Sequence, residues 1–374
     1  MSGGGSVISS EIVDSLSKQG HNVFVIVPKI NWKEARFEPV LDSKIKIIRV
    51  KTPLENNIKF AARLCKNNLE KEIEIVCKNN NIELIFSIFH PFHRVPHAAV
   101  KVGRKLKIPT LIKVDDAIYA KSSRVKSLQR KIENISNRKI LQNTDKIFVV
   151  NESVKKIIIN EYKIREDRIS VIPNGIDIKK FEKKIKNEQT FTVIFSGVMY
   201  YHRGLDILLD SISKVVLKIP NIKVVLLGDG PEMEKLKEIS QKRNLRKNIK
   251  FKGWIDRNNI PNYLAGSSIG IGPLMLTEVT KNALPIKVLE YMASSLPIIA
   301  KTGTLSNDIL KEGKNGFFIN DSEDLAAKLE LLASEEKLLT KMGKESFNMV
   351  QKFDWANITS IILDEYKKIK KNNS

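Results

Sequence analysis

Three of the five histidines in the chain lie close together, in the segment HPFHRVPH at residues 90–97. His93 and His97 are four positions apart, and on a helix that spacing places two imidazoles on one face, where they could hold a metal ion. The segment has no carboxylate ligand, and its two prolines disfavour a regular helix. We therefore predict no metal site here. His90 follows an apolar run, so we expect it at the carboxyl end of a strand, where open α/β sheets bind ligands.

Several signatures of common catalytic chemistry are missing from the sequence. It has no G-x-x-x-x-G-K-[ST] phosphate loop, no G-x-S-x-G nucleophile elbow and no complete G-x-G-x-x-G after a predicted strand. No two aspartates stand two positions apart, so it has no Asp-x-Asp metal clamp. The two cysteines, Cys65 and Cys77, match no zinc or redox spacing. We predict that both are reduced thiols of a cytoplasmic protein.

The elements that could position reactive side chains alternate along the whole chain. Short runs rich in Val, Ile and Phe are separated by stretches of helical length, and several runs are apolar at nearly every position. Such runs are typical of strands buried on both faces of a parallel sheet. Their alternation with helices indicates βαβ architecture. The fold class is therefore predicted to be α/β.

The length of 374 residues fits two domains better than one. About six of the apolar runs precede residue 175 and about six follow it. A Pro-Asn-Gly turn signal at residues 173–175 predicts a boundary close by. We expect an N-terminal domain over 1–176, a C-terminal domain over 177–352, and a helix over 353–374.

The beginning of the first domain departs from the usual order. A doubly wound domain opens with a strand, then a glycine turn, then a helix. Here the glycines at 3–5 are almost the first residues, and a helical pattern over 8–18 follows at once. We expect from this that the first strand of the N-terminal domain is missing because the chain begins late.

Six short motifs stand in order along the chain. They are VIPNGID at 171–177 with Phe181, SGV at 196–198, HRG at 202–204, LGDGP at 227–231, FKGW at 251–254 and NALPIKVLEYMA at 282–293. With Gly3-Gly4 and Gly20-His21 near the start, this set resembles the retaining nucleotide-sugar glycosyltransferases of family 4. The resemblance covers nearly the whole chain. It implies the GT-B fold, in which two Rossmann-like doubly wound domains face a central cleft and the final helix crosses back to the N-terminal domain.

The resemblance implies that the C-terminal domain binds a nucleotide diphosphate sugar. Glu290 matches the second glutamate of the family's signature pair, which binds the donor ribose; its two oxygens can accept from two vicinal hydroxyls. Asn282 replaces the first glutamate, a departure that removes a charge. Gly197, Gly253 and Trp254 fall in the matched motifs as donor-binding candidates, and the family reads the nucleobase largely through backbone near Gly253. UDP-, GDP- and ADP-sugars all stay open as donors.

Cleavage of the bond between sugar and diphosphate requires stabilisation of the leaving charge. Arg203 matches the basic residue of the family's diphosphate clamp, whereas Val198 replaces its companion arginine. Lys287, one turn before Glu290, is expected to supply the missing charge. Cations and helix N-termini can do this without a divalent ion. We therefore predict a metal-independent reaction with no cofactor, and Arg203 and Lys287 as catalytic as well as donor-binding residues.

Other matched positions lie in the N-terminal half, where the resemblance places the acceptor. Gly3 and Gly4 match a glycine pair that allows close backbone approach to donor phosphate and acceptor. Asp115 stands where the family has a histidine near the reacting sugar, and it is a catalytic candidate with His90; a helix cap is the alternative for Asp115. The implied reaction is hexose transfer with retention, by front-face displacement without a protein nucleophile. The implied acceptor is a glycan or lipid-linked molecule in cell-surface polysaccharide or glycoconjugate synthesis.

Residues 121–139 carry seven Lys or Arg against one Glu. The apolar residues of this segment recur at helical spacing and form one stripe. They are Val125, Leu128, Ile132 and Ile135. Two interpretations stay open. The helix lies on an anionic membrane at the inner face of the cell membrane, or its stripe packs on the sheet, which we favour slightly.

The formal net charge of +22 predicts attraction to something anionic. A basic nucleic-acid-binding protein is one alternative, but the sequence has no helix-turn-helix, RRM, KH or zinc signature. A second alternative is a catalytically weakened relative that serves as a partner or scaffold, because of Val198, Asn282, Asp115 and the early start. A nucleotide-sugar epimerase fits the motifs less well. We therefore expect a glycosyltransferase with no nucleic-acid partner.

Overall fold

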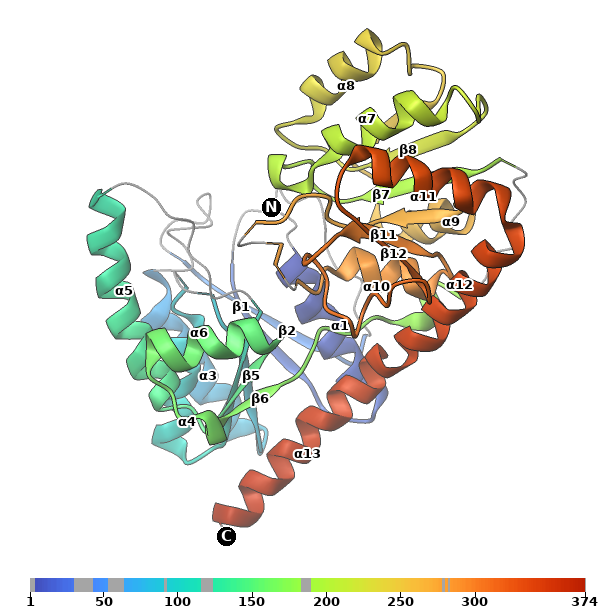
Figure 1. Ribbon diagram of the computed structural model, residues 1–374. Coiled ribbons are helices and arrows are strands. Elements are labelled where there is room, and N and C mark those ends of the chain that lie inside the picture. Colours follow the sequence, from blue (N-terminus) through green and yellow to red (C-terminus); the bar gives the residue numbers. More distant parts are fainter. Residues whose placement is uncertain are drawn as a thin grey trace. The chain divides into compact units, whose positions relative to one another are not determined.

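The computed structural model describes residues 4–29, 43–52, 64–90, 93–115, 124–182, 190–277, 280–281 and 283–373. The chain divides into two compact units (Figure 1). Unit 1 takes in residues 1–174 and 355–374, and unit 2 takes in residues 175–354. Each unit is described by itself.

Unit 1 contains two parallel sheets. The strands of the first are β1 (Phe24–Pro28) and β2 (Lys46–Val50), and those of the second, in spatial order, are β3 (Ile85–Ile88), β4 (Thr110–Val114), β5 (Lys146–Val149) and β6 (Ile169–Val171). All five residues of β4 are buried, as expected for a central parallel strand covered on both faces. The first described element is a helix, and within the described part of the chain no strand precedes it.

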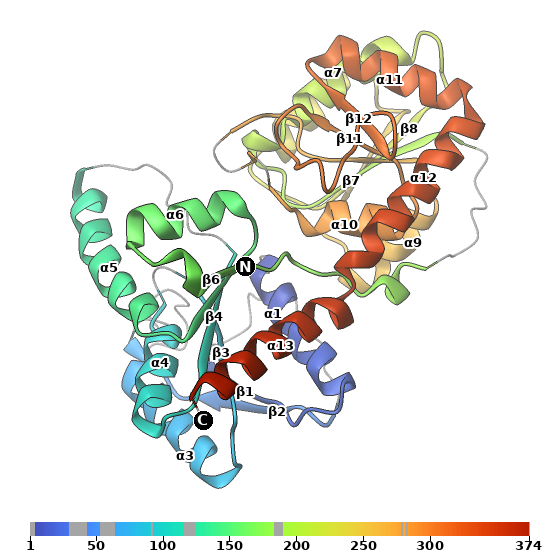
Figure 2. The same ribbon diagram turned by 60° about the horizontal axis from the view of Figure 1, so that its bottom comes forward.

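The helices of unit 1 are α1 (Gly4–Lys18), α3 (Lys66–Asn79), α4 (Val95–Leu106), α5 (Arg124–Gln142), α6 (Glu152–Tyr162) and α13 (Trp355–Asn373). Helix α13 packs beside α1 although the two lie at opposite ends of the sequence (Figure 2). Ser15 and Thr359 join them through a 2.9 Å hydrogen bond between their hydroxyls. On α13, Glu365 also forms an ion pair with Lys146 of β5, with 3.2 Å between the charged atoms.

Two expectations for unit 1 are corrected by its helices. Pro96 does not prevent a helix, because α4 begins at Val95 with Pro96 in its first turn, where a missing N–H costs nothing. His97 therefore lies on a helix, not in a loop. Gly4 and Gly5 do not form a turn either, since α1 already begins at Gly4.

Unit 2 contains one six-stranded parallel sheet. Its strands, in spatial order, are β12 (Gly316–Ile319), β11 (Ile298–Lys301), β10 (Ile269–Ile271), β7 (Thr192–Ser196), β8 (Lys223–Leu227) and β9 (Ile249–Gly253). The chain order runs outward in one direction from β7 to β9 and in the other from β10 to β12. This is a doubly wound sheet whose order reverses between β7 and β10. Ligands of open α/β sheets bind outside the carboxyl ends of the strands at such a point.

Helices cover both faces of this sheet. They are α7 (Leu205–Val215), α8 (Met233–Lys242), α9 (Ile260–Ala265), α10 (Ile286–Ala293), α11 (Ser322–Ser334) and α12 (Glu336–Val350). Successive side chains of a strand point to opposite faces, and β7 follows this rule. Val193 and Phe195 pack in a core with α7 and α11, whereas Ile194 packs in a second core with α10. The hydrophobic alternation of the sequence thus places α10 against the middle of the sheet.

Candidate functional site

The loops after β7 and β8 touch at the carboxyl edge of the sheet in unit 2. Gly197 follows β7 and donates to the carbonyl of Leu227 at 2.9 Å, and Met199 donates to the carbonyl of Asp229 at 2.9 Å. Gly228 has φ +121°, and a Cβ at this position would collide with the carbonyl oxygen of Gly197. Only glycine therefore allows the two loops to approach this closely.

Helix α10 carries Lys287 and Glu290 one turn apart, and both residues are buried, with exposed fractions of 9% and 2% for the whole residues. The ammonium of Lys287 lies 3.7 Å from the centre of the Phe195 ring. It is also 3.5 Å from the point where a Cβ on Gly197 would lie. Its Nζ has no hydrogen-bond partner among the residues that the structure describes. A basic group is thus held beside the loop after β7, with its hydrogen-bonding capacity unused within the described part of the chain.

Arg203 adds a second positive group to the same edge. It closes the 3₁₀ turn Tyr201–Arg203, immediately before Gly204 and the start of α7. Its Nε is buried and, within the described part of the chain, has no hydrogen-bond partner. Burial lowers the pKa of Arg203. Burial, and then the charge of Arg203, lowers the pKa of Lys287 well below its usual range, while Glu290 raises it. The two cations repel each other, so an anion bound between them would be stabilised.

Tyr291 holds α10 in place against two strands. Its hydroxyl accepts a 2.7 Å hydrogen bond from the backbone N–H of Ser196 at the end of β7. Its ring packs on Gly270 of β10, where a Cβ would collide with the ring. Burial raises the pKa of Tyr291 far above its usual range, so it remains a neutral phenol. Because α10 is tied to β7 and β10, Lys287 and Glu290 are fixed at the reversal point of the sheet.

Glu290 forms an ion pair with a residue that the sequence analysis missed. Nη1 of Arg257 lies 2.8 Å from Oε1 of Glu290. Arg257 opens the 3₁₀ turn Arg257–Asn259 that follows β9. The signal that could have drawn attention to it is an arginine just after the FKGW motif, which ends at Trp254. Gly253 ends β9, and Trp254 beside it is 42% exposed. Asn282 lies outside the described residues.

Asp115 in unit 1 follows β4 directly and is bound to a buried lysine. Lys113 of β4 is fully buried, and its Nζ donates to Oδ1 of Asp115 and, at 2.7 Å, to Oδ1 of Asn174. The other oxygen of Asp115, Oδ2, is buried and has no partner among the described residues. The lysine therefore holds one carboxylate oxygen, and the other has no hydrogen-bond partner within the described part of the chain. Lys113 is a second residue that the sequence analysis missed.

His90 follows β3, as predicted, and its ring stacks on that of His93 with 4.0 Å between the ring centres. Gly3 lies outside the described residues, and Gly4 is the first residue of α1. Within the described ranges, no three histidine, cysteine or carboxylate side chains are grouped so that they could hold a metal ion. The structure thus places Asp115 and His90 after neighbouring strands of unit 1.

His97 belongs to a polar network that joins α4 to α5. Its Nε2 lies 2.9 Å from the hydroxyl of Ser136 and 3.1 Å from Nη1 of Arg94. Arg94 forms a 2.8 Å ion pair with Glu133, which is 1% exposed. Burial lowers the pKa of His97 to about 4, with a smaller contribution from the charge of Arg94.

This network departs at one position from the favoured interpretation of residues 121–139, in which the apolar stripe packs on the sheet. The buried face of α5 carries Glu133 and Asn137, whereas Ile135 of the apolar stripe is 72% exposed. The stripe therefore does not pack on the sheet at Ile135. The side chains of Val125, Leu128 and Ile132 lie outside the described residues.

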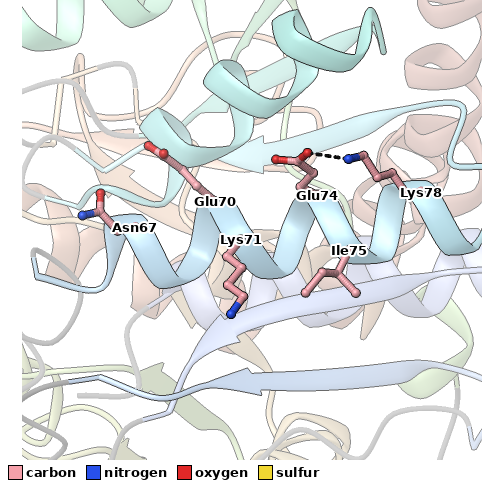
Figure 3. Close-up of a pocket in the computed structure, with 6 residues that line it drawn as sticks. All are labelled: Asn67, Glu70, Lys71, Glu74, Ile75 and Lys78. Carbon is pink, nitrogen blue, oxygen red and sulfur yellow. Dashed lines mark ion pairs between the residues drawn. The ribbon is translucent and has the colours of Figure 1, made fainter.

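A shallow hollow lies along one face of α3 (Figure 3). It is lined by Asn67, Glu70, Lys71, Glu74, Ile75 and Lys78. Glu74 forms ion pairs with Lys78 at 2.7 Å and with Lys105 of α4 at 2.8 Å. These two lysines lower the pKa of Glu74 to about 2. Because its carboxylates are already paired, we assign no site to this hollow.

Two family models match the chain and together take in nearly all of it. The model described as Glycosyltransferase Family 4 matches residues 2–180, and the model described as Glycosyl transferases group 1 matches residues 177–349. The two models meet close to the division between the two units.

Two curated relatives illustrate the range of similar proteins. The chain is 28% identical over 237 residues to UDP-Gal:alpha-D-GlcNAc-diphosphoundecaprenol alpha-1,3-galactosyltransferase of Escherichia coli. The aligned residues make up 56% of this chain and 58% of that protein. The match thus spans a little over half the length of that relative. The chain is 21% identical over 354 residues to alpha-monoglucosyldiacylglycerol synthase of Acholeplasma laidlawii. The aligned residues make up 89% of this chain and 85% of that protein. No described helix has the length and apolar character to span a membrane.

Solved structures with similar folds include a glycosyltransferase from Rickettsia africae, with a TM-score of 0.73 and 20% identity over 99% of this chain and 96% of that one. HepE from Anabaena, solved in complex with UDP, has a TM-score of 0.75 and 14% identity over 98% of this chain and 97% of that one. Likeness at these identities shows the fold. It is GT-B, with two Rossmann-like domains, as the sequence predicts.

Proposed function

The chain belongs to glycosyltransferase family 4, and from that membership we propose that it transfers a hexose from a nucleotide diphosphate sugar to a glycan or lipid-linked acceptor, with retention at the anomeric carbon. The observation that carries the proposal is the pair of basic residues beside the loop after β7, the half-buried Arg203 and the buried Lys287. Buried charges without partners are costly. A bound diphosphate offsets that cost by supplying the missing negative charge.

The donor diphosphate is proposed to bind at this edge of unit 2. Arg203 provides a planar guanidinium whose Nε is unpartnered among the described residues, and Lys287 provides a compact ammonium. Gly197 lies beside Lys287, so no side chain separates the ammonium from the loop. The switch point of a doubly wound sheet is the usual place for such a ligand. HepE, which shares the fold, was solved with UDP bound.

The two cations also stabilise the leaving group in the proposed reaction. The bond between C1 of the sugar and the diphosphate oxygen breaks, and the bond between C1 and the acceptor oxygen forms on the same face. The acceptor proton passes to the leaving phosphate oxygen. Charge therefore develops on the diphosphate, where preorganised cations are most effective. Arg203 and Lys287 fill the role that a divalent ion would otherwise have, so we propose that the reaction needs no metal.

Glu290 is proposed to bind the ribose of the donor, and Asp115 the reacting sugar. Each carboxylate has one oxygen held by a cation, Arg257 for Glu290 and Lys113 for Asp115. Carboxylates held in this way accept hydrogen bonds from sugar hydroxyls. His90, at the end of the strand beside β4, is proposed to contribute to the acceptor side of the same unit.

The acceptor is proposed to be lipid-linked, with peripheral contact at an anionic membrane through residues 121–139. The names of two relatives include a diphosphoundecaprenol and a diacylglycerol. The outward direction of Ile135 on α5 supports this, because the opposite face carries Glu133 and Asn137. A basic helix with an exposed apolar stripe binds the surface of an anionic bilayer. The membrane interpretation is therefore better supported than packing on the sheet.

Nucleotide binding tests the proposal most directly. The melting temperature of the chain is measured with UDP, GDP and ADP and with their glucose derivatives, since a ligand that binds the folded state stabilises it by mass action. We expect one nucleotide to raise the melting temperature and Glu290→Ala to reduce the rise. Glu238→Ala, at an exposed glutamate of α8, is the matched control.

A transfer or donor-hydrolysis assay follows the binding measurement. Turnover that is lost with Arg203→Ala supports the enzyme. Binding without turnover of any sugar nucleotide would instead support the weakened relative, for which Val198 in place of an arginine is the motivating observation. If no nucleotide binds, the assignment of the site is wrong.

A further inference from the structure

Arg257 and Glu290 come from different elements and meet in the fold of unit 2. Arg257 opens the turn after β9, and Glu290 lies on α10. Their charged groups are 2.8 Å apart, from Nη1 to Oε1. The side chain of Glu290 is 3% exposed and that of Arg257 is 19% exposed. Bulk water therefore screens this pair only weakly.

A carboxylate as deeply buried as Glu290 needs a cation close by in order to stay ionised. Lys287 lies on the same helix, but its ammonium lies over the ring of Phe195. At ion-pair distance from Glu290 lies the guanidinium of Arg257. Removal of one partner of such a pair leaves the other charge buried and uncompensated.

The backbone that presents Arg257 is held by local hydrogen bonds. The carboxylate of Asp256 accepts from the backbone N–H of Asn258 at 2.9 Å, and its carbonyl accepts from the N–H of Asn259 at 2.9 Å. Arg257 thus sits on a capped turn three residues after Trp254, at the edge of the sheet where β9 ends. A cation on a fixed turn restricts the orientation of the carboxylate with which it pairs.

We propose that Arg257 is a positioning residue that keeps Glu290 ionised and holds its Oε1, so that the carboxylate is presented to the vicinal hydroxyls of the donor ribose. The proposal rests on the function proposed above. It assigns to Arg257 a role in distinguishing ribonucleotides from deoxyribonucleotides, without a contact between Arg257 and the nucleotide. An ionised, oriented carboxylate accepts hydrogen bonds from hydroxyl groups more strongly than a mobile or protonated one.

The test compares the affinities of the stabilising nucleoside diphosphate and of its 2′-deoxy counterpart, measured by calorimetry. We expect the wild type to prefer the ribonucleotide by about tenfold, the size of one hydrogen bond to a charged group. Arg257→Met should remove most of that preference, and Arg257→Lys should retain part of it. Arg246→Met, at an exposed arginine of the same unit, should leave the preference unchanged.

The double variant Arg257→Met with Glu290→Ala separates positioning from a general structural effect. If Arg257 acts through Glu290, the double variant should show the same small preference as Glu290→Ala alone. An Arg257→Met protein that loses affinity for both nucleotides equally, with its preference intact, would overturn the proposal. If Arg257→Met does not fold, the ratio of the affinities for the ribonucleotide and its 2′-deoxy counterpart is measured for Arg257→Lys and Arg257→Gln instead.

Failure of the underlying function has a different signature. If Glu290→Ala itself keeps the full preference for the ribonucleotide, Glu290 does not bind the ribose, and the donor assignment fails whatever Arg257 does. If Glu290→Ala loses the preference and Arg257→Met keeps it, the donor assignment stands and only the role of Arg257 is wrong.

Discussion

The ammonium of Lys287 lies 3.7 Å from the centre of the Phe195 ring and has, within the described residues, no hydrogen-bond partner. A ring face attracts a cation but does not replace the hydrogen bonds that water would make. Burial and the charge of Arg203 accordingly lower the pKa of Lys287. The residue is suited to gain a proton and a partner together when an anion binds.

Nucleotide binding should therefore be coupled to proton uptake at Lys287. A bound diphosphate favours the charged ammonium, so the pKa of Lys287 is higher in the complex than in the free protein. The affinity should be constant below the pKa of the free protein and fall as the pH rises above it. Calorimetry in buffers of different ionisation enthalpy measures the protons taken up. Lys287→Met should bind more weakly and show less uptake; equal uptake in both proteins would contradict the prediction.

Metal removal should leave turnover unchanged, because Arg203 and Lys287 are proposed to supply the charge. Initial rates are compared with and without EDTA, and then with added manganese. Arg203→Ala should lower kcat by about 100- to 1000-fold, as expected for removal of a preorganised charge. Arg246→Ala is the control. Activity that disappears with EDTA and returns with manganese would show that the cations do not replace a divalent ion.

Asp115→Asn should destabilise unit 1, because it removes the negative partner of the fully buried Lys113. A buried ion pair that loses one member costs about 3 kcal/mol or more, since the other charge stays in the core. Urea unfolding measures the loss. The double variant Lys113→Met with Asp115→Asn should recover much of it, because the stranded charge is gone. A double variant less stable than Asp115→Asn would argue against this account.

The stability of unit 1 should fall as the pH drops from 6.5 toward 4. Burial lowers the pKa of both His93 and His97 to about 4 in the folded chain, whereas an unfolded histidine titrates near 6.5. In that window the unfolded chain binds protons that the folded chain does not, so protonation favours unfolding. Unfolding midpoints are measured across the range. His97→Gln should show a shallower decline, and an unchanged slope would show that His97 does not contribute.

Vesicles that contain anionic lipid should bind the chain through α5. Replacing Lys126, Arg130, Lys131, Arg138 and Lys139 by glutamine should greatly weaken sedimentation with phosphatidylglycerol vesicles, since each basic residue contributes about 1 kcal/mol near such a surface. The matched control removes the same kind of charge from α13, at Lys367, Lys368, Lys370 and Lys371. Binding that is lost only in the control would assign the surface to α13 instead.

The sequence by itself predicted the architecture and the family, and the structural and family comparisons confirm both. Strands such as β4 and β7 are buried on both faces, so their apolar runs are visible without knowledge of what covers them. The turn at Gly228 requires a positive φ, which glycine adopts readily, so the glycine in the sequence indicates the turn. Such features are local, and a one-dimensional pattern records them. The roles of Glu290, Arg203 and Lys287 were inferred from motif positions and stay predictions.

Only the tertiary structure decided which charged residues pair. Arg257 and Glu290 belong to different elements, and so do Lys113 and Asn174; no spacing in the sequence relates them. The exposure of Ile135 was also not predictable from the sequence, because a helix with one apolar stripe predicts burial of that stripe. Here Glu133, which pairs with Arg94, and Asn137 are buried, and Ile135 is exposed. Periodicity reports that a helix has two different faces, whereas long-range polar contacts determine which of them meets the core.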